Sequence, residues 1–380
     1  MYTRRVTQPF NKLLSQVLVA FTIEFDNEFA DRMAKTFARP FGVSLVMWSN
    51  FMRFVHADGT PVEEIAERSG IPQKDVASVV GGMERWGYIT VDHDPSTGVP
   101  PRRTGFGSAK GVKAGTRIFP SQVGSLALER WEGLPAEIES RWRSRMGDQT
   151  VDDLRDALTA VGRQIELVMP HFLPIIGSGG SFTVLQLERG QSEPDDDLPA
   201  LLSRVLLPFT LDYESHADIS LALSANLLRV LDDDPIHANS LPLATGTSKE
   251  AVSMSTTWLV RNDYMTVEPN PDGRGKVVRR TPKGAAAQDA YRERVADVEA
   301  GWRERCGSER IDALRSSHEA ILNQPGGEDG PLSAGLVTPP GGWRSTKQYK
   351  PLSEASIADP AGALPHHPMV LHRGGWPDGS

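Results

Sequence analysis

Cations gather in two short stretches of this chain, although the chain as a whole is acidic, with a formal net charge of −8. Residues 100–117 contain five bases and no acid: Arg102, Arg103, Lys110, Lys113 and Arg117. The second stretch has Asp272 as its single acid beside Arg274, Lys276, Arg279, Arg280 and Lys283. Because Lys and Arg supply most of the affinity for nucleic-acid phosphates, these clusters predict two phosphate-binding surfaces.

Other residues that could do chemistry form no catalytic or metal-binding pattern. The sequence has no Ser/His/Asp elbow, P-loop, HExxH or dinucleotide fingerprint. The acidic runs at 195–197 and 232–234 lack the alternation of a calcium loop. His366, His367 and His372 have no suitable fourth ligand nearby in the sequence. We therefore expect no enzymatic activity, no metal and no cofactor.

Two short predicted helices, residues 61–69 and 72–86, precede the first basic stretch and are joined at Gly70, a residue type that often ends helices. Apolar residues of the second helix recur at the spacing of one helix face: Val76, Val79, Val80 and Met83. The opposite face then presents Lys74, Ser78, Gly81 and Arg85. This arrangement predicts a helix-turn-helix with a polar outward face.

A β-hairpin is predicted to hold each basic cluster. Tyr88 to Val91 alternates like a strand, and a Gly/Pro-rich basic stretch leads back to Ile118 and Phe119. Farther along, residues 265–267 and 277–278 bracket a turn at 269–275 that is rich in Pro, Gly, Asn and Asp. Each hairpin follows a short helix pair, so both read as wings.

The chain repeats itself. LLSQVLVAFTIEFD at 13–26 matches LLSRVLLPFTLDYE at 201–214 with an offset of 188, and VSLVMWSNFMRFV from Val43 matches ISLALSANLLRVL from Ile219 with an offset of 176. The offset of 176 continues from GYITV at 87–91 to DYMTV at 263–267, and RWRSRMG at 141–147 matches GWRERCG at 301–307 with an offset of 160. The matches are collinear, which indicates a duplication. We place the two insertions of the first copy in loops, because loops tolerate length changes better than packed helices.

The expected fold class is mainly α with small β-wings (α+β), in which two winged helix-turn-helix domains are joined through a helical pseudo-dimer base. Each copy is predicted to contain a long helix, a second helix, two short helices, a basic hairpin and two C-terminal helices. Trp142 and Trp302 align, and we expect them in the core of the base. The domain boundaries are 1–170, a linker at 171–199, 200–324, and a tail at 325–380.

At this point the sequence resembles the MarR family of bacterial winged-helix regulators. EEIAERSGIPQKDVASVVGGMERWGYITV at 63–91 is similar to that family's helix-turn-helix and first wing strand, and DGRGKVVRRTPKG at 272–284 to its wing. The resemblance covers about residues 10–170 and 200–323. It departs from the family in the glycines at 81 and 82, in a longer first wing, and in the second outward stripe, Glu250, Met254, Thr257 and Arg261.

The resemblance implies a regulator, here a repressor, that binds double-stranded DNA as a monomeric pseudo-dimer. The helix faces would enter adjacent major grooves, and the wings would contact flanking minor grooves. The expected DNA-contacting residues are Lys74, Ser78, Arg85, Arg102, Arg103, Ser253, Thr257, Arg261, Arg274, Lys276 and Arg279. The rival interpretation is a protein-interaction or ligand-sensing module whose DNA-reading heads have eroded.

The family also implies a small-molecule pocket between the base and each head. Phe25, Trp48 and Tyr213 are the residues we expect to face a small aromatic or acidic effector there. The alternative is that these aromatic residues belong to the core.

Composition predicts a cytoplasmic protein that does not enter membranes. No apolar run reaches the roughly 20 residues that span a bilayer, and the single cysteine, Cys306, cannot form an internal disulfide. The Gly/Pro-rich tail cannot form a domain of its own. It nevertheless carries Trp343, Tyr349 and Trp376, so we expect parts of it to dock on the base or in a pocket.

Overall fold

The computed structural model describes residues 8–37, 43–69, 73–92, 115–175, 187–190, 197–371 and 374–379. The described chain is mainly helical and contains two small antiparallel sheets, with strand orders β1-β3-β2 and β4-β6-β5. The broader fold prediction, α+β with a predominance of helix, is confirmed.

The first copy of the repeat runs from a long helix through a small sheet to three helices. Its elements are α1 (Phe10–Phe37), α2 (Leu45–Asn50), the 3₁₀ helix η1 (Met52–Phe54), β1 (Thr60–Pro61), α3 (Val62–Ser69), α4 (Gln73–Arg85), β2 (Ile89–Val91), β3 (Arg117–Pro120), α5 (Gln122–Trp131), α6 (Leu134–Met146) and α7 (Asp148–Gly162).

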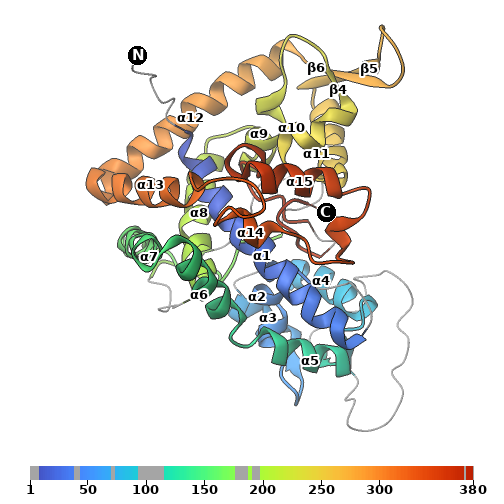
Figure 1. Ribbon diagram of the computed structural model, residues 1–380, viewed down its shortest axis with the longest axis vertical. Coiled ribbons are helices and arrows are strands. Elements are labelled where there is room, and N and C mark those ends of the chain that lie inside the picture. Colours follow the sequence, from blue (N-terminus) through green and yellow to red (C-terminus); the bar gives the residue numbers. More distant parts are fainter. Residues whose placement is uncertain are drawn as a thin grey trace.

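The second copy has the same order. Its elements are α8 (Leu198–Glu214), α9 (Leu221–Asn226), η4 (Leu228–Val230), β4 (Ile236–His237), η5 (Ala238–Ser240), α10 (Leu241–Thr245), α11 (Lys249–Arg261), β5 (Met265–Pro269), β6 (Lys276–Arg280), α12 (Pro282–Cys306) and α13 (Ser308–Leu322). We call residues 60–120 the first head and residues 236–280 the second head. The two heads lie toward opposite ends of the molecule, with the other helices between them (Figure 1).

The sheets of the two heads have the same register. Thr60 pairs with Ile118 in the first head, and Ile236 pairs with Val278 in the second. These pairs are related by the offsets of 176 and 160 found in the sequence. A slip of one residue would turn every side chain to the other face, so the shared register supports a true duplication.

The junction between each sheet and the next helix is also duplicated. The Thr281 hydroxyl caps α12 by accepting a hydrogen bond from the Gly284 amide at 3.0 Å, and the Thr281 amide donates to the Tyr264 carbonyl at 3.1 Å. Ser121 caps α5 at the Gly124 amide in the same way, at 3.1 Å. A side chain on either glycine would overlap a backbone carbonyl oxygen, so the helices can approach the strands this closely only with glycine there.

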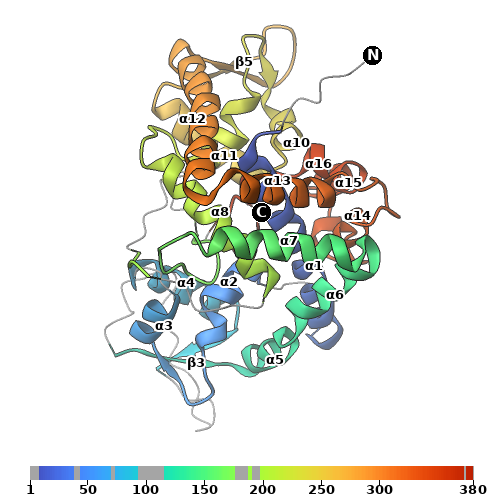
Figure 2. The same ribbon diagram turned by 90° about the vertical axis from the view of Figure 1, so that its left-hand side faces the viewer.

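The helical base joins the copies: α1 packs against α8, and α7 packs against α13. Figure 2 shows α7 and α13 at the front, on the side that lies at the left in Figure 1. Trp142 and Trp302 are fully buried in this base, as the sequence predicted. Equivalent ion pairs brace the helices, from Arg155 to Glu139 and from Arg315 to Glu299, each at 2.7 Å.

The first insertion of the first copy is not in a loop, so that prediction was wrong. The added residues largely continue α1 to Phe37, whereas α8 ends at Glu214. Phe29 and Met33 lie on this extension and are buried. Their burial stabilises the extra helical turns. The region of the second insertion, 93–114, lies outside the described residues.

The prediction of two C-terminal helices holds for the second copy but fails for the first. There the stretch equivalent to α12 is divided into α5 and α6. Pro135 lacks the amide that would continue the helix hydrogen-bond ladder, and Gly133 before it adopts a φ of 77°. The second copy has Val295 at the position of Pro135, and α12 runs on without a break.

The tail docks on the rest of the protein, as the sequence predicted. It contains α14 (Ser333–Leu336), η6 (Trp343–Ser345), α15 (Lys350–Ala358) and α16 (Pro360–Ala363). Met369 and Val370 are each 1% exposed. The Gln16 amide donates to the Leu364 carbonyl at 2.6 Å, and the Asn226 amide donates to the His367 carbonyl at 2.8 Å.

Among the described residues, no helix combines the length and apolar character needed to cross a membrane.

Candidate nucleic-acid interface

The outward face of α4 is described at two of its four residues, Gly81 and Arg85. Its apolar face, including Val76 and Met83, is buried as predicted. Arg85 at its end is exposed, and Gly81 faces open space. The side chains of Lys74 and Ser78, and the whole of Arg102 and Arg103, lie outside the described part of the chain.

In the second head, Ser253, Thr257 and Arg261 are all exposed on α11. The Thr257 hydroxyl donates to the Ser253 carbonyl at 2.8 Å, within the helix. Arg261 and Arg85 are equivalent residues of the repeat, and each is the last residue of its helix. The two heads therefore present one cation each at matching positions.

The β5–β6 hairpin presents Arg274 and Lys276, both exposed near its turn. Arg279 is half-buried and donates to the Asp233 carbonyl at 3.2 Å. Arg280 pairs with the Asp233 carboxylate at 2.8 Å. The acidic run at 232–234 thus holds the base of the hairpin, a role that its sequence did not reveal.

The tail covers part of the outward face of α11. Ser248, which caps α11, donates its amide to the Asp378 carbonyl at 2.8 Å and its hydroxyl to the Gly379 carbonyl at 2.6 Å. Gln348 donates to the Glu250 carboxylate at 2.8 Å. Met254 packs against a buried cluster that includes tail residues. Half of the predicted outward stripe is therefore engaged within the protein.

The aromatic residues expected to face an effector lie in the core. Phe25, Trp48 and Tyr213 are at most 2% exposed. The rings of Phe25 and Trp48 both lie against Trp131, with centroids 4.7 Å and 4.5 Å away. Burial raises the pKa of Tyr213 to about 12.

Two cations, Lys12 and Arg229, lie near Tyr291, which neighbours Tyr213. The ring of Tyr213 contacts Tyr291, whose hydroxyl accepts a hydrogen bond from Asn11 at 3.3 Å. Burial lowers the pKa values of Lys12 and Arg229; repulsion by Arg229 lowers that of Lys12 further, and attraction to Asp359 partly opposes this. In the described part of the chain, neither cation forms an ion pair within 4 Å. Positive charge that is this poorly compensated favours an anion.

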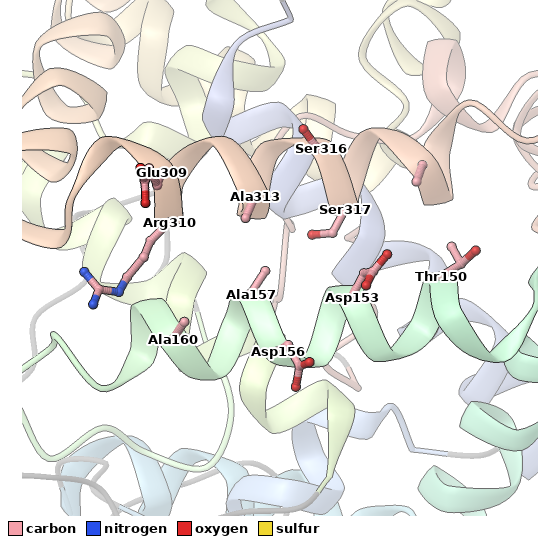
Figure 3. A pocket seen from close by; sticks show the side chains of 11 residues that line it. Thr150, Asp153, Asp156, Ala157, Ala160, Glu309, Arg310, Ala313, Ser316 and Ser317 are labelled. Carbon is pink, nitrogen blue, oxygen red and sulfur yellow. The ribbon is translucent and has the colours of Figure 1, made fainter.

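The opposite side of the molecule is hollowed between α7 and α13. This groove has a volume of about 660 Å³, and small residues such as Ala157, Ala313 and Ser317 lie between the helices (Figure 3). Three acids, Asp153, Asp156 and Glu309, line it against the single base Arg310. Acidic surfaces repel phosphates, so this groove is not a candidate for binding nucleic acid.

Comparison with known proteins identified no matching family model, no similar curated protein and no similar solved structure. Among the described residues, no group of His, Cys, Asp and Glu side chains could hold a metal ion.

Proposed function

We propose that this chain is a transcriptional regulator that binds double-stranded DNA, with each head acting as a winged helix-turn-helix of the MarR type. The observation that carries the proposal is the repetition of one architecture in two heads, each with an outward helix ending in an exposed arginine, Arg85 or Arg261. Two equivalent basic heads in one chain match the two half-sites that dimeric regulators bind.

In this proposal α4 and α11 enter successive major grooves, and the β5–β6 turn follows the DNA backbone with Arg274 and Lys276. The acidic groove between α7 and α13 faces away from the DNA (Figure 2). The two heads differ in the continuity of the following helix and in the tail over α11. We therefore expect an asymmetric or imperfectly palindromic operator, which the protein occupies as a repressor and a single-chain pseudo-dimer.

The experiment is selection of binding sites from a random duplex library, followed by titration of the enriched sequence. We expect two half-sites to be enriched. Replacing Arg261 and Arg274 with Ala should weaken binding, and each lost phosphate contact should lower the salt slope by about 0.9. The charge-matched control replaces Arg163 and Arg310, which are exposed on the α7–α13 side. Failure to enrich any sequence contradicts the proposal.

The rival function, a protein-interaction or ligand-sensing module, is favoured by one observation. Glu250 and Met254 of the outward stripe contact the tail rather than solvent alone. A module that has lost DNA binding would give no enriched sequence and no affinity for random duplex at low salt. Stable DNA binding that depends on Arg261 excludes it.

We also propose that an acidic effector binds beside Tyr213, at Lys12 and Arg229. Lys12 lies in α1 and Arg229 in η4, which precedes the second head, so an anion between them could alter how the head is held. Calorimetric titration with an aromatic carboxylate tests this, and Arg229→Met should abolish the binding. Equal affinity in the variant would place any effector elsewhere.

A further inference from the structure

The tail contains a third basic segment, and it has no acid. Residues 330–353 include Arg344, Lys347 and Lys350 and no Asp or Glu. This is the pattern that marks the basic stretch at 100–117. Arg344 is buried, whereas Lys347 and Lys350 are exposed. The nearest acid to Lys350 is Glu354, 3.6 Å away in a pair that is more than half exposed, and such a pair is readily exchanged for a phosphate contact.

This segment lies beside the beginning of α11. Gln348, between the two lysines, donates to Glu250 in the first turn of α11 at 2.8 Å. In Figure 1 the tail, drawn in red around the C-terminal marker, lies at a height between α11 and α4, whereas Figure 2 shows α14, α15 and α16 at the right and α4 at the left. Lys347 and Lys350, on either side of Gln348, are therefore placed beside the first turn of α11 in the second head.

Aromatic and ionic contacts hold the segment in place. The ring of Trp343 lies 4.8 Å from that of Tyr349 and 4.9 Å from that of Trp376. The Arg344 guanidinium stacks over Trp343 at 4.3 Å and pairs with Asp378 at 3.5 Å. A segment fixed in this way loses little conformational entropy when it binds a ligand.

The segment also lies beside the end of α11 that the tail partly covers. Recognition helices touch base edges mainly through their N-terminal residues. Here Ser248 at that end is hydrogen-bonded to the Asp378 and Gly379 carbonyls, and Met254 packs against a buried cluster that includes Met369 and Leu371. The groups exposed at this end of the second head thus include tail residues.

We infer that the C-terminal tail is a third DNA-contacting element, in which Lys347 and Lys350 bind backbone phosphates beside the half-site read by the second head. The inference rests on the proposed function. It assigns the tail a direct part in DNA binding, where a purely structural tail would only brace the heads.

The test compares the full-length parent protein with the double variant Lys347→Ala/Lys350→Ala by fluorescence anisotropy, using a random duplex of about three helical turns across a salt series. Both lysines are exposed, so the variant should fold, and thermal unfolding checks this. We expect weaker binding and a fall of about 1.8 in the magnitude of the salt slope, because two phosphate contacts are lost. The charge-reversed pair Lys347→Glu/Lys350→Glu should weaken binding further.

The control double variant Arg163→Ala/Arg310→Ala removes the same charge from the opposite side and should leave the slope unchanged. A parent that binds DNA, with a lysine variant that matches it in affinity and slope, overturns the inference and leaves the proposed function standing. Tighter binding by the lysine variant overturns it equally. If the parent protein binds no DNA at low salt, both the inference and the proposed function are contradicted.

Discussion

The indole Nε1 of Trp142 donates a hydrogen bond to Oε2 of Glu24 at 2.8 Å within the helical base. The repeat reproduces this bond between Trp302 and Asp212 at 2.7 Å. In each copy an arginine three residues after the tryptophan also binds that carboxylate. The pseudo-symmetry of the base thus extends to individual polar contacts.

The two tryptophan bonds should differ in strength. Glu24 is 5% exposed, whereas Asp212 is 40% exposed. Trp142→Phe leaves a buried carboxylate short of a donor and should lower the free energy of unfolding by about 2 kcal/mol. Trp302→Phe should cost about 1 kcal/mol or less beyond the packing loss, because water can replace the donor. Urea unfolding checks both variants, and equal losses would contradict this account.

Gly284 and Gly301 lie in the same helix, α12, and should respond oppositely to substitution. A methyl group on Gly284 would overlap the Tyr264 carbonyl oxygen, whereas nothing lies within 4 Å of one on Gly301. We expect Gly284→Ala to lower the free energy of unfolding by at least about 2 kcal/mol. Gly301→Ala should raise it by about 0.5–1 kcal/mol. Equal melting temperatures in the two variants would contradict the close contact between Gly284 and the Tyr264 carbonyl oxygen.

His318 should make the protein sensitive to acid. It is fully buried, and burial lowers its pKa from 6.5 to about 4. The unfolded chain therefore takes up a proton between pH 6.5 and 4 that the folded chain refuses, so stability is complete above pH 6.5 and falls as the pH falls. The first copy has Leu158 at this position. His318→Leu should reduce the loss of stability between pH 6.5 and 5 by about 2 kcal/mol.

Urea titrations of parent and variant at the two pH values measure this difference. His367, which is also buried with a pKa lowered to about 4 by burial, is unchanged in both proteins and cancels in the comparison. Identical acid sensitivity of parent and variant would contradict the assignment to His318.

Arg344 should control the docking of the tail. It is 3% exposed, pairs with Asp378 at 3.5 Å, and lies 3.9 Å from Asp26, whose pKa is raised to about 8 mainly by burial. Arg344→Met removes the buried guanidinium that pairs with Asp378 and should cost about 3 kcal/mol. We expect faster proteolytic cleavage beyond about residue 325, while Lys350→Ala changes nothing. A tail that stays resistant in Arg344→Met would show that apolar burial alone holds it.

Much of the fold could be predicted because it depends on local patterns. The apolar spacing of Val76 to Met83 set the buried face of α4, and the collinear offsets anticipated the paired registers. The aromatic content of the tail, including Trp376, also indicated that it packs. Each of these signals is carried by nearby residues or by direct comparison of the two copies.

The contacts of the tail with the second head could not be predicted. Ser248 bonds backbone carbonyls 130 and 131 residues away, and a carbonyl gives no sequence signal. The continuation of α1 depends on the burial of Phe29 and Met33 against other parts of the protein. Both the tail contacts and the longer α1 depend on contacts between residues far apart in the sequence, which a single sequence does not show.

The most direct test of the central claim is fluorescence anisotropy of the purified protein with duplex DNA across a salt series, beside the triple variant Arg85→Ala/Arg261→Ala/Arg274→Ala. We predict that the parent binds, that its log affinity falls linearly with log salt, and that the variant shows a slope lower by about 2.7 in magnitude. No binding by the parent at low salt, or the same slope in parent and variant, would contradict a DNA-binding function for these two heads.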